Sequence, residues 1–257
     1  MAPITDFAPL LGADLLARDF EVVDLTRSIF EGMPQWYGHQ RTFITTNQTH
    51  EQFEKMWKSK CGFEAHNLLI SEHCGTHTDA VFEYDPNGPH LDESPLALYY
   101  GPAICLDVSA GIASSTDKLG RAALEKALAD SGLEIRRGDT VLLHFGYGDR
   151  VWPELAYADE NPGLSTEAAE WLAEQGVVNI GVDHMSIDSS TDADSEGHMV
   201  CKKYGIVNTE SLTNLDMVVD KRFLFFGLPL NIRAGTGSPI RAIAILVNPD
   251  TFAGSAS

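Results

Sequence analysis

Basic residues are scarce in this chain of 257 residues, which has 18 lysines and arginines against 37 aspartates and glutamates and a formal net charge of −19. Nucleic acids and anionic membranes bind to basic protein faces. The charge balance therefore argues against both as partners. It also disfavours an anionic substrate, unless a metal ion reverses the charge locally.

Cysteines and long apolar runs are scarce as well. The four cysteines, at positions 61, 74, 105 and 201, form no Cys-x-x-Cys pair, which indicates reduced thiols rather than a disulfide framework. The first residues lack the basic start and long apolar stretch of a signal peptide. No window reaches the roughly eighteen apolar residues of a membrane span. These absences predict a soluble, cytoplasmic protein.

Extended and helical patterns alternate along the chain. Runs of β-branched and aromatic residues predict strands at 22–25, 104–108, 141–145, 177–182, 223–228 and 242–247. Helical spacing predicts a helix between Asp117 and Gly132 as its caps, a second from Ser165 to Gln175, and a short one over 51–58. Strands separated by helices predict an α/β fold whose sheet is covered, at least in part, on both faces.

No repeat or linker divides the sequence. We therefore expect a single domain over 1–257, with an N-terminal arm at 1–20 and a C-terminal tail at 249–257.

The run from His73 to Asp79, His-Cys-Gly-Thr-His-Thr-Asp, has the composition of a metal site. A divalent metal is bound by imidazole nitrogens and carboxylate oxygens that converge from about 2 Å. On an extended backbone His73, Gly75, His77 and Asp79 share one face, and Gly75 leaves room for the ion. The alternative is a set of buried polar residues that only satisfy one another. The ligand types and spacing favour metal binding.

Further polar groups follow downstream. The stretch Gly181–Asp188 leaves a predicted strand and is rich in Ser and Asp, and strand ends are where α/β folds bind ligands. His198 and Glu210 come next. They could complete one metal site, or hold a second ion beside the first with Asp79 as the bridge.

The HxGTHxD run, the GxDxxSxD stretch and the His-x11-Glu pair resemble, in the same order, the cyclase-type metal hydrolases, over about residues 21–248. That superfamily includes bacterial kynurenine formamidase, isatin hydrolase and trans-dienelactone hydrolase. The resemblance implies a swivelling β/β/α fold, with a barrel-like mixed sheet flanked by helices. It implies one or two Mn²⁺ or Zn²⁺ ions per subunit, and a homodimer or homotetramer with active sites near the subunit contacts. The matching ligands are His73, His77 and Asp79 for one ion, and Asp79, His198 and Glu210 for the other.

The sequence departs from the family pattern HxGTHxDxPxH, whose last histidine is often assigned as the acid/base. Here Val81 and Glu83 occupy the proline and histidine positions. A carboxylate can transfer protons if its surroundings tune its pKa, and it can also ligate a metal. We expect Glu83 to be the acid/base or metal-linked group, with His184 and His90 as the competing imidazoles.

Aromatic residues upstream of the metal motif are candidates for a flat apolar substrate pocket. Trp36 lies in a turn and is the strongest candidate, and Trp57, on the expected short helix, is the next. Phe63 and His144 complete the predicted substrate-binding set. Ordinary packing is the alternative for each of them.

The expected function is hydrolysis, by metal-activated water, of an amide bond in a small aromatic or cyclic substrate, as in isatin hydrolase or arylformamidase. No GxSxG elbow is present, which disfavours a covalent serine route. A lactone hydrolase resembling trans-dienelactone hydrolase is one alternative. A non-catalytic, metal-dependent binder of a small aromatic ligand is another.

Overall fold

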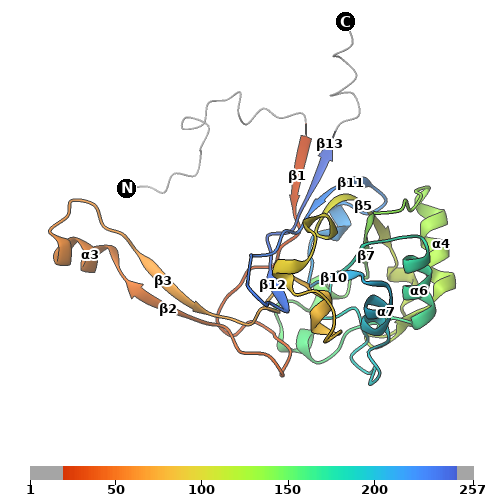
Figure 1. Ribbon diagram of the computed structural model, residues 1–257, viewed down its shortest axis with the longest axis horizontal. Helices are drawn as coiled ribbons and strands as arrows, with labels where there is room; N and C mark the ends of the chain where they lie inside the picture. The colour runs from red at the N-terminus through yellow and green to blue at the C-terminus, as the bar shows by residue number, and fades with distance from the viewer. Residues whose placement is uncertain (1–19, 248–257) are drawn as a thin grey trace, which may run out of the picture.

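The computed structural model describes residues 20–247, and a curled, nine-stranded mixed sheet dominates it (Figure 1). From one edge to the other the strands are β1 (Phe20–Asp24), β13 (Ile243–Val247), β11 (Arg222–Phe226), β5 (Tyr100–Asp107), β7 (Thr140–His144), β9 (Asn179–Val182), β10 (Val207–Glu210), β4 (His77–Asp79) and β12 (Gly237–Pro239). The central β5, β7, β9 and β10 are parallel, and the outer pairs are antiparallel. The expected α/β fold with a barrel-like mixed sheet is confirmed. Apart from Phe20, the arm at 1–20 and the tail at 249–257 lie outside the described residues.

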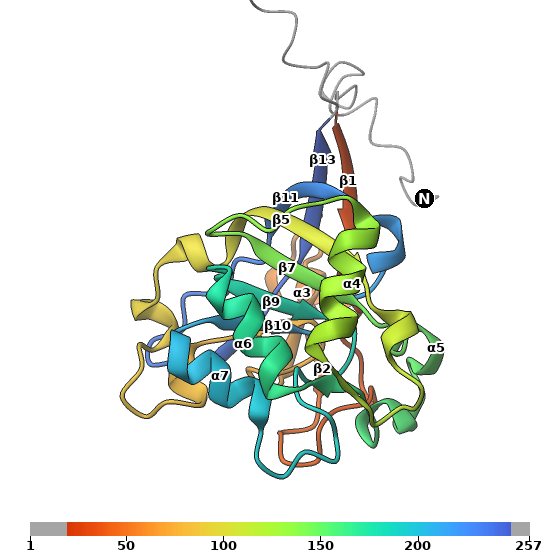
Figure 2. The same ribbon diagram turned by 90° about the vertical axis from the view of Figure 1, so that its right-hand side faces the viewer.

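Helices cover the outer face of the parallel strands (Figure 2). They are α4 (Arg121–Ser131), α6 (Thr166–Glu174) and α7 (Glu196–Tyr204). Ile104 and Leu106 of β5 point into the core beneath these helices, whereas Ala103 and Cys105 point into a second core on the other face. This period of two explains why β5 is apolar along most of its length, because both of its faces are buried.

The predicted helices are present, with one difference at a boundary. Ser165 caps α6, since its hydroxyl accepts a hydrogen bond from the amide of Ala168. The prediction that Asp117 caps the N-terminus of α4 is wrong, because α4 begins at Arg121 after Gly120. The Asp117 carboxylate instead accepts hydrogen bonds from the amides of Ala113 and Ser114 and closes the preceding loop.

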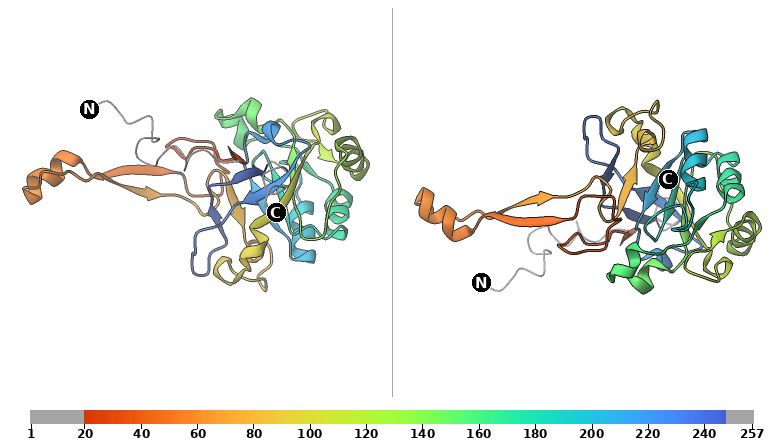
Figure 3. Two further views of the ribbon diagram at one scale, coloured as in Figure 1. Left: turned by 90° about the horizontal axis from the view of Figure 1, so that it is seen from above. Right: turned by 90° about the horizontal axis from the view of Figure 1, so that it is seen from below.

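A hairpin arm, residues 43–69, projects away from the body (Figures 1 and 3). Two antiparallel strands, β2 (Phe43–Gln48) and β3 (Ala65–Leu69), carry the short helix α3 (His50–Trp57) near the tip. These two strands form a sheet of their own, separate from the nine-stranded one. Other short elements include β6 (Lys118–Leu119), β8 (Gly163–Leu164) and α5 (Gly148–Val151). Within residues 20–247, no helix has both the length and the apolar character needed to cross a membrane.

Candidate metal centre

Strand register brings the distant candidate ligands together. β4 lies between β10 and β12, so that His77 is paired with Glu210 on one side and Asp79 with Gly237 on the other. His73 reaches the same place from the turn before β4. Glu210, 133 positions after His77 by numbering, is thus its direct neighbour across the sheet.

The prediction that the whole run from His73 to Asp79 is extended is wrong. Only His77–Asp79 form a strand. Gly75 has φ of +63°, a left-handed conformation that L-residues with a side chain rarely adopt. A Cβ added at Gly75 would lie 3.4 Å from Ile29 and Met33 rather than over the ligands. The glycine therefore permits the turn that folds His73 back onto His77, and it does not clear space for an ion.

The imidazole of His77 is held so that one nitrogen is free to bind a metal. Its Nδ1 lies 2.8 Å from the carbonyl oxygen of Gly75. Because a carbonyl only accepts, Nδ1 carries the proton, and the lone pair is on Nε2. Nε2 lies 3.4 Å from Asp79 Oδ1 and 3.5 Å from Glu210 Oε2. Fixing the outer nitrogen in this way is typical of histidines that ligate metals.

His73 is also fixed at its outer nitrogen, but here that nitrogen is Nε2, and Nδ1 faces the cluster. The hydroxyl of Thr236 donates to Glu72 Oε2 at 2.7 Å, so its oxygen can accept from His73 Nε2 at 3.0 Å. Nδ1 of His73 then faces Asp79 Oδ1 at 2.7 Å. Gly237 allows this approach, because a Cβ there would lie 2.6 Å from the His73 ring.

These groups have the donor types and the spacing of a candidate metal site. His73, His77 and Asp79 are all buried and offer one ligand atom each within 4.8 Å of one another. Asp79, His198 and Glu210 form a second such group. Nitrogen and carboxylate oxygen are suitable donors for zinc and for manganese.

A buried carboxylate orients His198 in the second group. Asp188 Oδ2 lies 2.5 Å from His198 Nδ1, which leaves Nε2 3.9 Å from Asp79 Oδ2 and 3.7 Å from Glu210 Oε1. Asp188 belongs to the GxDxxSxD stretch, but it was not among the predicted site residues. As with His73 and His77, a hydrogen bond fixes one ring nitrogen, but here the partner is a carboxylate rather than a hydroxyl or a backbone carbonyl.

The buried charges shift one another's pKa values. Burial raises the pKa of Glu83 to about 9 and that of Glu210 to about 8, and repulsion from Asp79 adds to both shifts. Burial alone would lower the pKa of His73, but Asp79 attracts and hydrogen-bonds its charged form and raises the pKa to about 9. Burial lowers the pKa of His77 to about 4. A buried cluster with this many carboxylates calls for positive charge, supplied either by protons or by a cation.

The three acid/base candidates lie in different surroundings. Glu83 lines the cavity over the cluster, and its Oε1 is 3.5 Å from His73 Nδ1. His184 is fully buried against Phe145, and burial lowers its pKa to about 3. His90 stacks on Phe82 with ring centroids 3.6 Å apart. Neither His184 nor His90 lines the cavity, so of the three only Glu83 is in position to meet a substrate there.

The cavity over the cluster has a volume of about 560 Å³. Trp36 lines it, as predicted for a substrate-binding residue, together with Tyr37 and His39. His39 was missed by the sequence analysis, although its ring lies 5.0 Å from that of His73. Residues of the loop after β9 and His198 also line it.

Three predicted substrate-binding residues lie elsewhere. Trp57 and Phe63 are on the hairpin arm, with 66% and 58% of their surface exposed, and do not line the cavity of their own chain. His144 ends β7 and lines a different hollow, beside Asp107. Both aromatics lie in the connection between β2 and β3, which the two-stranded hairpin holds away from the main sheet.

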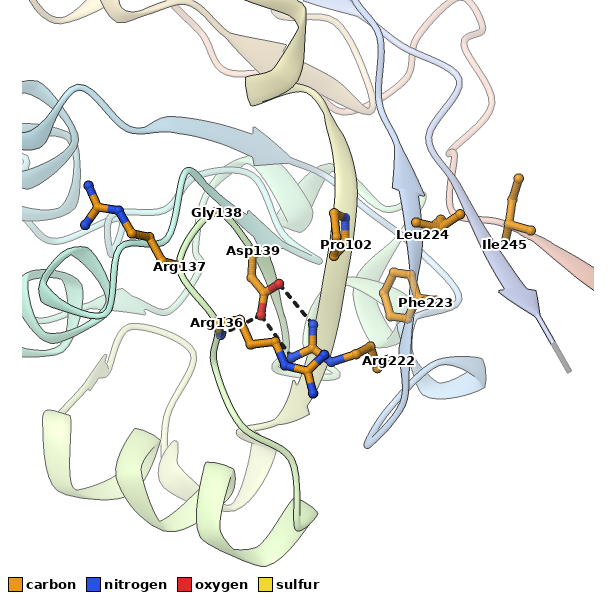
Figure 4. A pocket seen from close by; sticks show the side chains of 9 residues that line it. All are labelled: Pro102, Arg136, Arg137, Gly138, Asp139, Arg222, Phe223, Leu224 and Ile245. Atoms are coloured by element: carbon orange, nitrogen blue, oxygen red, sulfur yellow. Dashed lines mark hydrogen bonds and ion pairs between the residues drawn. The ribbon is translucent and has the colours of Figure 1, made fainter. Parts of the chain in front are cut away.

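A further hollow, with a volume of about 480 Å³, is lined by residues of β5, β11 and β13 and by the loop before β7 (Figure 4). Its Arg222 donates to both oxygens of Asp139, at 2.9 and 3.0 Å, so this guanidinium charge is already paired. None of the predicted site residues lines this hollow. The chemistry expected from the sequence is therefore concentrated in the cavity over the histidine–carboxylate cluster.

The sequence is similar to those of bacterial kynurenine formamidases. The kynurenine formamidase of Bacillus cereus (strain ATCC 10987 / NRS 248) is 28% identical over 225 residues, which cover 87% of this chain and 96% of that protein. The kynurenine formamidase of Bacillus mycoides (strain KBAB4) is 31% identical over 176 residues, which cover 68% and 77%.

Solved structures show the same fold. Isatin hydrolase A from Labrenzia aggregata superposes with a TM-score of 0.79 at 24% identity, covering 95% of this chain and 100% of that one. An isatin hydrolase bound to the product analogue thioisatinate gives 0.80 at 24% identity, covering 96% and 100%. The model of the Cyclase family, described as "Putative cyclase", matches residues 23–189. The chain belongs to the Cyclase family.

Proposed function

We propose that this protein is a metal-dependent hydrolase that opens the C–N bond of an amide in a small aromatic or cyclic substrate, as isatin hydrolase or kynurenine formamidase does. The observation that carries the proposal is the pair of imidazoles, His73 and His77, each fixed at its outer nitrogen and facing Asp79 with the other. Family membership and the kynurenine formamidase relatives support hydrolysis of an amide C–N bond.

The proposed cofactor is Mn²⁺ or Zn²⁺, held by His73, His77 and Asp79, with Glu210 Oε2 beside them. When bound, such an ion lowers the pKa of a coordinated water towards about 7 and polarises a carbonyl. The chain supplies the donors, fixes the outer ring nitrogens by hydrogen bonds, and places the site in the wall of a cavity.

Glu83 is the proposed proton carrier. Its carboxyl group lines the cavity next to His73 and can take a proton from the attacking water and pass it to the leaving nitrogen. Its raised pKa results from burial and repulsion from Asp79. A dication held by the donors would offset that repulsion and favour the carboxylate form of Glu83. Trp36, in the cavity wall, is placed to contact a flat substrate.

The alternatives make different demands on the cavity. None of the relatives and structures described above is named a lactone hydrolase, so they give the lactone proposal no support. A non-catalytic binder would not need a titratable group such as Glu83 facing the metal donors. A cytoplasmic location is also proposed, supported by the free thiols of the four cysteines.

The proposal is tested by assaying isatin, N-formylkynurenine and trans-dienelactone with metal-free protein and after addition of Mn²⁺ or Zn²⁺. We expect metal-dependent turnover of isatin or N-formylkynurenine, and none by the metal-free protein. Turnover of the dienelactone alone would indicate that the substrate is a lactone and not an amide. Stoichiometric metal without turnover of any of the three would favour the ligand-binding alternative.

We also propose that the hairpin arm docks on a second copy of the chain, forming a homodimer or a larger homo-oligomer. The arm exposes several apolar side chains: Phe43, Met56, Trp57, Phe63, Leu68 and Leu69. A two-stranded hairpin is marginally stable alone in water, and clustered exposed apolar residues mark interfaces. Trp57 and Phe63 would then bind substrate at the partner's cavity rather than at their own, which reconciles their predicted role with their position.

Trp57→Ala tests the role of the arm. We expect the dissociation constant of the dimer to rise by about thirtyfold or more, because an aromatic hot spot contributes about 2 kcal/mol or more to an interface. We also expect KM to rise. Sedimentation equilibrium and steady-state kinetics measure both. Leu96→Ser, at an equally exposed apolar position on the body, is the matched control and should change neither. A wild-type monomer with full activity would contradict the proposal.

Metal binding should release protons. At pH 7 the metal-free site keeps protons on His73, Glu83 and Glu210, whose pKa values are about 9, about 9 and about 8. Protons compete with the ion below these pKa values and are absent above them, so apparent affinity should rise from pH 6 to about pH 9 and then level off. Titration calorimetry in two buffers of different ionisation enthalpy counts the released protons. Affinity independent of pH, with no proton released, would contradict the assigned ligand environment.

A further inference from the structure

Asn208 lies inside the second group of candidate ligands. It is two residues before Glu210 on β10, so the two side chains share one face of the strand. The residue is fully buried, and a buried amide must find partners for its hydrogens. The partners that it finds are the carboxylates that a second ion would need.

The amide nitrogen of Asn208 contacts all three members of that group. Nδ2 donates to Asp79 Oδ2 at 2.6 Å and to Glu210 Oε1 at 2.9 Å. His198 Nε2 is 3.5 Å from the same nitrogen. A side-chain amide has two N–H hydrogens, and both are directed at oxygens whose lone pairs a cation would otherwise accept.

In each of the two carboxylates, Asp79 and Glu210, one oxygen binds protein donors and the other faces the first group of candidate ligands. Glu210 Oε1 accepts a second hydrogen bond, from the amide of Ile187 at 2.9 Å, whereas its Oε2 faces His77 at 3.5 Å. Asp79 Oδ2 accepts the hydrogen bond from Asn208, and Asp79 Oδ1 faces His73 Nδ1. One oxygen of each carboxylate is thereby left for the first ion, and the other is occupied by protein donors.

The orientation of the amide follows from its partners. With Nδ2 inward, its hydrogens meet two carboxylate oxygens, and Asn208 Oδ1 is a buried acceptor without a partner in the described part of the chain. With the amide reversed, Oδ1 would face those same oxygens and repel them. In a metal-free cluster the inward Nδ2 is therefore the favoured orientation.

From this geometry we propose that the Asn208 amide takes the place of a second cation, so that each chain binds a single divalent ion, at His73, His77 and Asp79. The inference rests on the proposed metal dependence and adds to it the number of ions. His198 then borders the site without ligating the ion.

The test is the number of ions per chain, measured by elemental analysis after loading with Mn²⁺ or Zn²⁺ and removal of excess ion. Wild type should retain one. Asn208→Ala removes the competing hydrogens and opens space among Asp79, Glu210 and His198, so it should retain two. Asn208→Leu fills a similar volume without N–H groups or ligand atoms, and should retain one.

His198→Ala in the otherwise native chain keeps the proposal testable if the Asn208 variants do not fold. It should still retain one ion, because His198 is not a ligand. Two ions in wild type, one ion in Asn208→Ala, or loss of the ion from His198→Ala would each overturn the inference. Loss of metal from Asn208→Ala would also overturn it and would indicate that the reversed amide ligates through Oδ1. No ion and no hydrolysis in wild type would instead refute the proposed function.

Discussion

His77→Ala is expected to abolish metal retention and amide hydrolysis together, lowering kcat/KM by roughly a thousandfold or more. The ring sits at the centre of the cluster, with Nδ1 donating to Gly75 and Nε2 facing both Asp79 and Glu210. Losing the ion removes several kcal/mol of stabilisation of the developing charge, and about 4 kcal/mol corresponds to a thousandfold in rate. Elemental analysis and steady-state kinetics on the same preparation measure the two losses.

The control for this variant is His50→Ala, which removes an exposed imidazole that is also paired with a carboxylate, Glu64. Its metal content should equal that of wild type. Circular dichroism should show that His77→Ala is folded. If His77→Ala kept a full complement of metal, the ligand assignment would be incorrect, whatever its activity.

Glu83→Gln is expected to lower kcat by about a hundredfold to ten-thousandfold, the range typical of a general acid/base, while the ion is retained. The substitution keeps the shape of the side chain and removes its titrating group. Glutamine cannot take a proton from water or return one to the leaving nitrogen. Pre-steady-state and steady-state rates, with metal content measured in parallel, separate proton transfer from metal binding.

Two outcomes would assign Glu83 differently. Turnover within a few fold of wild type would show that another group carries the proton. Loss of the ion together with activity would make Glu83 a ligand, consistent with its position 3.5 Å from His73 Nδ1. Glu167→Gln, at an exposed position in the first turn of α6, is the matched control and should leave both quantities unchanged.

Local patterns were sufficient to predict the main elements. The alternation of side chains between two buried faces makes most of β5 and β7 apolar, and such runs are recognisable without tertiary information. Ser165 marks the start of α6 because its hydroxyl caps the helix. The prediction for Asp117 was wrong because an aspartate side chain can either cap a helix or close a loop, and only the fold decides between these two roles.

The site was predictable as a composition but not as a geometry. The motif from His73 to Asp79 identifies the donors, yet the turn at Gly75 replaces the extended conformation expected over its first half. Thr236 and Gly237, which fix the ring of His73 and allow its approach, are about 160 positions away in sequence. The sequence does not identify Asn208 as a site residue, because only the pairing of β10 with β4 places its side chain beside Asp79.

The most direct test of the account is anomalous scattering from crystals of the metal-loaded protein, collected at the absorption edge of zinc or manganese. The account predicts a peak within about 2 Å of His73 Nδ1, His77 Nε2 and an oxygen of Asp79, in the cavity that Glu83 and Trp36 line. A peak elsewhere, or none in protein that hydrolyses an amide, would contradict it.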